Sequence, residues 1–392
     1  MSQQLIGRNV DLKLLRDEGY GIEVKSRKYL LIHKVPYVNA RREIKLGTLV
    51  SELDLAGDET RPPNTHVAYF IGEHPCHADG SLLSQIQHGG RQTLNNDLVV
   101  DYSFSAKPKP DERYRDYHHK METYVAIISQ PAQEIDPTVT AKTFPVIECT
   151  EEESVFKYAD TASSRAGIDA VTSKLEIGSV AIIGVGGTGS YVLDLVAKTP
   201  VREIHLFDGD EFVNHNAFRS PGAPSIEELR KRVKKVAYFS ELYSKMRRNI
   251  FAHPYFIDAS NVDELRGMNF VFLCIDSGRD KQAIVEKLEE WGIPFIDVGM
   301  GVELVEDSLI GILRVTSSTV NKRGHLRQRV SFADGGDNDY SRNIQIADLN
   351  ALNAALAVVK WKKLLGFYQD RENEHFSAYT IDGNALINED QI

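Results

Sequence analysis

The sequence predicts an α/β fold in which a doubly wound, largely parallel sheet follows a smaller α+β domain. The run 180–183 is short, continuous and apolar, as expected of a strand buried on both faces of a parallel sheet. A glycine-rich turn and a segment with helical spacing follow it directly. Two further apolar runs, 203–207 and 270–275, each lead into an aspartate. Repetition of strand, turn and helix in this order is typical of parallel α/β folds.

The bulk composition is that of an ordinary globular protein. At 392 residues the length predicts two domains, and 26% charged with 42% hydrophobic residues is an average balance. No apolar run approaches the roughly 20 residues of a membrane-spanning helix, and the N-terminus has no apolar signal segment. We therefore expect a cytoplasmic protein that does not bind membranes. The net charge of −10 argues against general nucleic-acid binding.

Residues 1–150 are predicted to form the α+β domain. The runs 29–33 and 66–71 read as strands separated by turn signals, and residues 11–15 begin a short amphipathic helix. Residues 111–129 predict a second helix whose apolar stripe is core: Tyr114, Tyr117, Met121, Tyr124 and Val125.

Cys76 lies in the polar stretch 73–77, Glu-His-Pro-Cys-His, and three interpretations are open for it. It is the one cysteine in a loop, so an acceptor thiol is one of them. The histidines around it, with His66 and His118–His119 elsewhere in the region, allow a metal ligand. The irregular spacing favours the third, a small structural side chain in a polar loop.

The second domain is predicted from residue 151 to 392, after the acidic run 151–153. It opens with a helical segment, 155–175, that contains Arg165. Later segments predict strands at 309–315 and 328–332, and an apolar-rich helix at 344–365. We interpret that helix as packing and dimer contact.

The glycine-rich turn predicts a bound nucleotide. Glycines allow a tight turn and a close approach of the backbone to a phosphate, and the N–H groups at the start of the helix point at the anion. Similar turns also occur in βα units that bind nothing. The glycines concerned are Gly184, Gly186, Gly187 and Gly189.

The residues after the second strand identify the kind of nucleotide. Asp208 stands where a Rossmann-like unit places a carboxylate for the ribose hydroxyls, which an NAD-dependent oxidoreductase would share. Asp210, Asn216 and Arg219 follow. A cation near the phosphates suits an enzyme that breaks an α–β phosphate bond better than one that transfers a hydride.

These motifs resemble the ThiF/MoeB and ubiquitin-activating superfamily of ATP-dependent adenylyltransferases over about residues 155–385. The chain has GVGGTGS at 184–190, then Asp-x-Asp, then Asn216 and Arg219, with Ser220 where the family has glutamine. The family lysine matches Lys235, with Lys231 and Lys234 as rivals. Asp276 matches the magnesium-associated aspartate, and Ser277 stands in place of an asparagine.

The resemblance implies adenylation of the C-terminal glycine of a ubiquitin-like protein with ATP and Mg²⁺. It places the ribose on Asp208, Arg219 and Lys235 at the departing pyrophosphate, and Mg²⁺ on Asp276. It also implies a homodimer in which an arginine of the partner subunit completes the site. Arg165 is the candidate for that arginine.

The chain departs from the family in lacking an acceptor cysteine. No cysteine follows Cys274, which itself lies in an apolar strand. The activated carboxylate is therefore expected to pass to a nucleophile on a conjugating-enzyme-like partner, with the N-terminal domain as a docking module or a divergent conjugating-type fold. Two other functions stay open: an NAD-dependent oxidoreductase and the non-catalytic half of a heterodimer.

Overall fold

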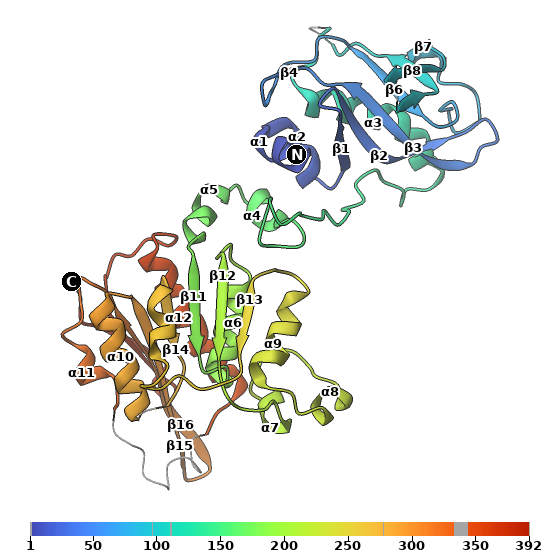
Figure 1. Ribbon diagram of the computed structural model, residues 1–392. Coiled ribbons are helices and arrows are strands. Elements are labelled where there is room, and N and C mark those ends of the chain that lie inside the picture. Colours follow the sequence, from blue (N-terminus) through green and yellow to red (C-terminus); the bar gives the residue numbers. More distant parts are fainter. Residues whose placement is uncertain (1, 96, 110–111, 277, 333–343, 392) are drawn as a thin grey trace. The chain divides into compact units, whose positions relative to one another are not determined.

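The computed structural model describes residues 2–95, 97–109, 112–276, 278–332 and 344–391. The chain forms two compact units, unit 1 at Met1–Ile147 and unit 2 at Glu148–Ile392 (Figure 1). Each has its own hydrophobic core. Among the described residues, none of the helices has the length and apolar character needed to cross a membrane.

Unit 1 is built on a six-stranded antiparallel sheet in the order β1-β2-β3-β6-β10-β7. Two helices precede it, a long helix follows it, and two small two-stranded sheets accompany it. The elements are α1 (Ser2–Arg8), α2 (Val10–Asp17), β1 (Gly21–Lys25), β2 (Tyr29–Val38), β3 (Ile44–Glu52), β4 (Leu55–Ala56), β5 (Glu59–Thr60), β6 (Val67–Ile71), η1 (Ser84–Ile86), β7 (Gln87–Gly89), β8 (Gln92–Asn95), β9 (Leu98–Val100), β10 (Tyr102–Ser105) and α3 (Tyr117–Ile135). The predicted α+β character is confirmed.

Helix α3 packs its apolar stripe against the sheet, as the spacing predicts. It begins at Tyr117, later than expected, because Asp116 caps it by accepting a hydrogen bond from the His119 N–H at 2.8 Å. Tyr117, Met121 and Tyr124 are fully buried in the unit 1 core.

Unit 2 contains an eight-stranded sheet in the order β13-β12-β11-β14-β15-β16-β17-β18. The first five strands are parallel, and β16 to β18 continue the sheet antiparallel. They are β11 (Ser179–Ile183), β12 (Glu203–Phe207), β13 (Ile250–His253), β14 (Phe270–Leu273), β15 (Phe295–Val305), β16 (Ser308–Ser318), β17 (Phe376–Thr380) and β18 (Ala385–Glu389). The chain order reverses between β11 and β14, and ligands bind at such a switch point in open α/β sheets.

Helices cover both faces of this sheet, so the predicted doubly wound arrangement is confirmed (Figure 1). Strand β11 shows why: Val180 and Ile182 face one core, and Ala181 and Ile183 face the other. Helices α6 (Gly187–Ala197), α9 (Lys235–Ser244) and α12 (Ala347–Leu364) cover the first face; α10 (Arg279–Trp291), η3 (Val262–Gly267) and α11 (Leu326–Arg329) cover the second. The short helices α7 (Asn214–Ala217) and α8 (Ile226–Arg230) follow β12.

Two of the predicted elements are wrong. The segment 155–175 is not one helix but three short ones, α4 (Thr161–Arg165), α5 (Asp169–Thr172) and η2 (Ser173–Leu175). Gly167 separates the first two at a positive φ of 68°, which a continuous helix does not contain. The strand predicted at 328–332 is also absent from the described residues, because its first part belongs to α11, whose Leu326 packs into the core.

Candidate functional site

The glycine turn closes at the C-terminal end of β11, against the end of β14. Gly184 has a positive φ of 83°, and a Cβ there would lie 2.6 Å from the Cys274 carbonyl oxygen. A Cβ on Gly189 would lie only 1.9 Å from the Gly184 carbonyl oxygen. A Cβ on Gly186, in contrast, would meet no described heavy atom within 4 Å. The turn is therefore closely packed at Gly184 and Gly189 and open at Gly186, just before α6, a shape suited to an anion.

Asp208 holds this turn to the second strand. Its carboxylate accepts the Val185 N–H at 2.9 Å and the Asp210 N–H at 2.8 Å, and it is 4% exposed. Each carboxylate oxygen can accept more than one hydrogen bond, so these two bonds leave further lone pairs available. Asp208 thus has a structural role and keeps the capacity to bind a hydroxyl group.

Lys235, rather than either of its rivals, lies in this site. Its buried ammonium is 2.6 Å from Asp210 and 3.6 Å from Asp208. Lys234 instead donates to the Gly209 carbonyl at 2.6 Å from an exposed position, and Lys231 is exposed just past α8.

Asn216 and Arg219 offer donors without partners at the same edge. Within the described residues, the buried Asn216 Nδ2 and Arg219 Nε have no hydrogen-bond acceptor. The Asn216 Oδ1 accepts the Val213 N–H at 2.9 Å, which fixes the amide in place. Buried donors of this kind carry a desolvation cost unless something accepts from them. They therefore fit an anionic ligand.

The charges around Arg219 place Asp276 at the same site. Burial lowers the pKa of the Arg219 guanidinium, and three carboxylates act in the opposite direction: Asp276, Asp210 and Asp208. Burial lowers the pKa of His215 on α7, and the positive charges of Arg219 and Lys235 lower it further. Carboxylates and cations that follow different strands thus lie together at the C-terminal edge of the parallel strands.

A buried ion pair supports the strand end that carries Asp276. The Lys281 ammonium on α10 lies 2.5 Å from Asp297 on β15 and donates to the Ile275 carbonyl at 3.3 Å. Burial raises the pKa of Asp297, while the charges of Lys281 and Arg314 act to lower it. The sequence did not indicate that Lys281 and Asp297 would form a pair.

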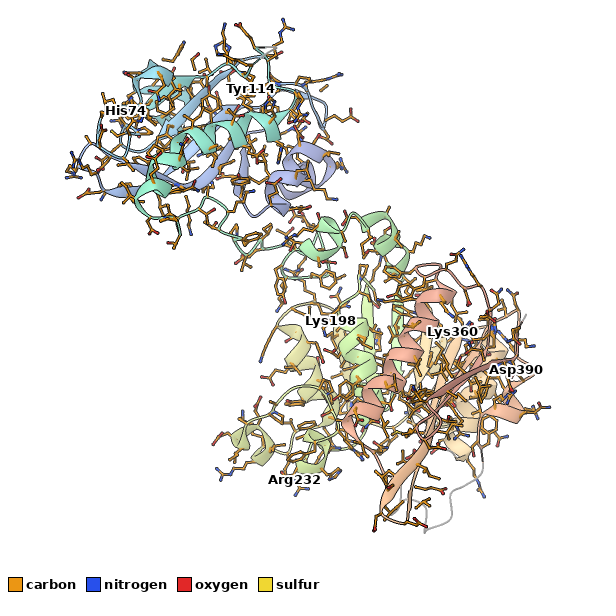
Figure 2. The ribbon with its side chains drawn as sticks, turned by 180° about the vertical axis from the view of Figure 1, so that it is seen from behind. His74, Tyr114, Lys198, Arg232, Lys360 and Asp390 are labelled. Carbon is orange, nitrogen blue, oxygen red and sulfur yellow. The ribbon has the colours of Figure 1, made fainter. Side chains whose placement is uncertain are left out.

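Arg165 does not join these residues within its own unit. It ends α4, which precedes β11 and lies at the edge of the sheet opposite the strand C-terminal ends (Figure 1). In Figure 2, Lys198 follows the C-terminal end of α6 and marks the edge of the sheet near α4. Arg232, close to α8, marks the opposite edge. Ser277 lies outside the described residues.

Helix α12 contributes polar contacts that its apolar sequence did not suggest. Asn350 and Asn353 are both 0% exposed. The Asn350 Oδ1 accepts from the Thr188 hydroxyl at 2.9 Å, and Asn353 donates to the Gly299 carbonyl at 3.1 Å. The interpretation of this helix as packing and dimer contact is therefore incomplete, because the Asn350 side chain also contacts the glycine turn.

In unit 1, the loop that carries Cys76 does not expose it. The side chain is 0% exposed, its thiol donates to the His74 carbonyl at 3.3 Å, and its N–H pairs with the Val38 carbonyl. Burial raises the pKa of the Cys76 thiol, and the negative charges of Glu73 and Asp79 raise it further. This environment disfavours a thiolate nucleophile and supports the structural interpretation.

The histidines near Cys76 do not gather around a metal site in the described residues. His74, whose position in unit 1 is labelled in Figure 2, packs edge-on against Tyr102 and Phe104. His118 does lie with Glu18 and Glu122 in a group of possible ligands. The Lys142 ammonium already pairs with Glu18 at 2.7 Å, so a cation occupies that carboxylate.

We expect Cys76 to be unreactive in the native protein. In a variant with Cys149→Ser and Cys274→Ser, a thiol-titrating disulfide reagent should label Cys76 only after denaturation, because both access and thiolate formation are blocked. Rapid native labelling, or a thiol-sensitive adduct with a partner protein, would contradict the structural role.

Two stretches of the chain match separate family models. Residues 159–304 match the model of the ThiF family, and residues 10–161 match the one described as Domain of unknown function (DUF6791). No curated protein matches the chain. Among solved structures, E. coli MccB with MccA-N7isoASN is 18% identical over 59% of this chain and 69% of that chain, with a TM-score of 0.45. E. coli MccB with ATP gives the same values. PaaA is 18% identical over 57% of this chain and 76% of that chain, with a TM-score of 0.43.

The ThiF match contains the glycine turn and all of the site residues at the C-terminal ends of the strands, from Asp208 to Asp276. The resemblance seen in the sequence is confirmed for this part of the chain. Residues 159–304 therefore resemble a ThiF family domain.

Proposed function

We propose that this protein uses ATP to adenylate the C-terminal glycine carboxylate of a ubiquitin-like protein. One observation carries the proposal: two cations, three carboxylates and a glycine turn meet at the switch point of a ThiF family sheet. The Asn216 Nδ2 and the Arg219 Nε, which have no acceptor within the described parts of the chain, favour a polyanion over a neutral ligand.

In this proposal the glycine turn binds the ATP phosphates through backbone N–H groups, and Asp208 binds the ribose. Arg219 and Lys235 interact with the departing pyrophosphate, where negative charge accumulates. Asp276 would hold Mg²⁺, which supplies further neutralisation of the phosphates.

The reaction needs no general base. An oxygen of the substrate carboxylate attacks the α-phosphorus, a mixed acyl–phosphate anhydride forms, and the bond between the α-phosphorus and the bridging oxygen breaks. The electron pair leaves with pyrophosphate, and no proton is transferred. The protein's contribution is therefore orientation and charge stabilisation.

A nucleophile on a conjugating-enzyme-like partner then attacks the acyl carbon of the adenylate, and AMP leaves as the bond between that carbon and the phosphate oxygen breaks. Burial raises the pKa of Cys274 and Cys76, so neither is suited to receive the acyl group. Unit 1 would serve as the docking module for that partner. A homodimer would bring Arg165 of one subunit to the site of the other, which suits its place at the far edge of its own sheet.

ATP–pyrophosphate exchange tests the proposal. A small protein ending in an exposed glycine should stimulate exchange of labelled pyrophosphate into ATP. Absence of exchange with any such protein, together with tight NAD binding, would favour the oxidoreductase. ATP binding without exchange would favour the non-catalytic half of a heterodimer. Either result would reject the proposal.

A further inference from the structure

Asn350 lies between two parts of the site that are far apart in the sequence. Its Oδ1 accepts the Thr188 hydroxyl at 2.9 Å, and its Nδ2 donates to the Arg219 carbonyl at 3.4 Å. A Cβ on Gly187 would lie 2.3 Å from the Asn350 Nδ2, so the amide lies flat against the turn. One side chain thus contacts both the glycine turn and Arg219, whose Nε has no acceptor among the described residues.

The buried, apolar surroundings of Asn350 make its polar side chain unfavourable for stability unless it forms hydrogen bonds. Asn350 is 0% exposed, and the same helix packs Ala354, Ala357 and Trp361 into the apolar core of unit 2. A buried amide in such a helix lowers stability relative to an apolar side chain unless its hydrogen bonds are made. Among the described residues, the Asn350 side chain makes them to Thr188 in the glycine turn and to the Arg219 backbone.

We propose that Asn350 is a positioning residue that fixes Arg219 relative to the glycine turn. The inference rests on the proposed function, in which the turn binds the phosphates and Arg219 meets the leaving pyrophosphate. A fixed spacing between the two matters because displacements of about 1 Å at a reacting group can cost roughly 10²-fold in rate. Asn350 itself touches no reacting atom.

Asn350→Asp separates positioning from folding. The carboxylate keeps the acceptor for Thr188, removes the donor to Arg219 and adds a negative charge beside the start of α6. A helix N-terminus stabilises a carboxylate, so the variant should fold without ligand. The same negative charge repels phosphate, and the new carboxylate oxygen repels the carbonyl oxygen of Arg219. The dissociation constant of MgATP should therefore rise about tenfold or more, while that of adenosine, which has no phosphate, stays unchanged.

Asn353→Asp is the matched control. It makes the same chemical change on the same helix at the same burial, next to Gly299 instead of the turn. It should leave the ratio of the MgATP and adenosine dissociation constants as in the wild type. Thr188→Val, which also serves if Asn350→Asp does not fold, removes one of the two contacts without adding a charge, and the MgATP constant should rise by roughly two- to tenfold.

NMR titration of full-length wild type and variants with MgATP and with adenosine gives both constants. Selective loss of MgATP binding in both Asn350→Asp and the uncharged Thr188→Val supports the positioning role, whereas loss in Asn350→Asp alone would reflect only the added charge and overturn it. Equal loss of both ligands, an unchanged Asn350→Asp, or an equal effect of Asn353→Asp would overturn it while leaving the proposed function intact. Failure of the wild type to bind MgATP would overturn the proposed function, and the inference with it.

Discussion

Replacing Arg219 by alanine is expected to lower ATP–pyrophosphate exchange by roughly 10²–10³-fold, the usual cost of removing one charge-stabilising donor. Arg219 is half-buried, and its Nε has no acceptor among the described residues, so its guanidinium is available for the leaving group. The loss should appear in kcat more than in KM for ATP, because charge on pyrophosphate develops as the bond breaks.

Arg232→Ala is the control for this prediction. Arg232 follows α8 and pairs with Glu211 at 2.9 Å on the surface. Its replacement by alanine changes the net charge by the same amount as Arg219→Ala. An exposed pair of this kind contributes about 0–1 kcal/mol, and exchange should be unchanged. Normal exchange in Arg219→Ala, or equal loss in both variants, would show that Arg219 has no specific role.

Gly189→Ala is expected to destabilise unit 2 and to abolish ATP binding. The added Cβ would lie 1.9 Å from the Gly184 carbonyl oxygen, and backbone cannot move aside without opening the turn. Overpacking of this kind costs about 1–3 kcal/mol, and here the displaced atoms form the proposed phosphate site. Both tryptophans, Trp291 and Trp361, lie in unit 2, so their fluorescence during urea unfolding reports on this unit in the full-length protein.

Gly267→Ala makes the same change in unit 2 where space is available. A Cβ at Gly267 would meet no described heavy atom within 4 Å. Its unfolding free energy should stay within about 1 kcal/mol of the wild type, since alanine also restricts the unfolded chain. A Gly189→Ala protein as stable as Gly267→Ala, with normal ATP affinity, would mean that the turn adapts and that its tight closure is not required.

The sequence was sufficient for the parts of the site that local pattern determines. A buried strand, a glycine turn and an acidic strand end lie close together in the chain, and their geometry follows from short-range sterics. Asp208 and the turn are therefore placed as predicted. The prediction of one helix over 155–175 was wrong because it did not allow for the break at Gly167, where a helix cannot continue.

The parts that the sequence did not reveal depend on contacts between distant segments. Asn350 contacts Thr188 and Arg219, and Asp297 pairs with Lys281, only because the sheet brings their elements together. Nothing in the local pattern of an apolar helix or a buried strand marks these residues. Cys76 differs, because its irregular surroundings in the sequence favoured a small structural side chain, and the structure buries it fully.

Adenylation of a terminal carboxylate can be tested by ATP–pyrophosphate exchange with two forms of one small glycine-terminated protein. One form has a free C-terminal carboxylate, and the other has the same terminus as an amide, which cannot attack the α-phosphorus. The account predicts exchange with the carboxylate and only the background rate with the amide. Equal exchange with both forms, or none with either, would contradict adenylation of the terminal carboxylate.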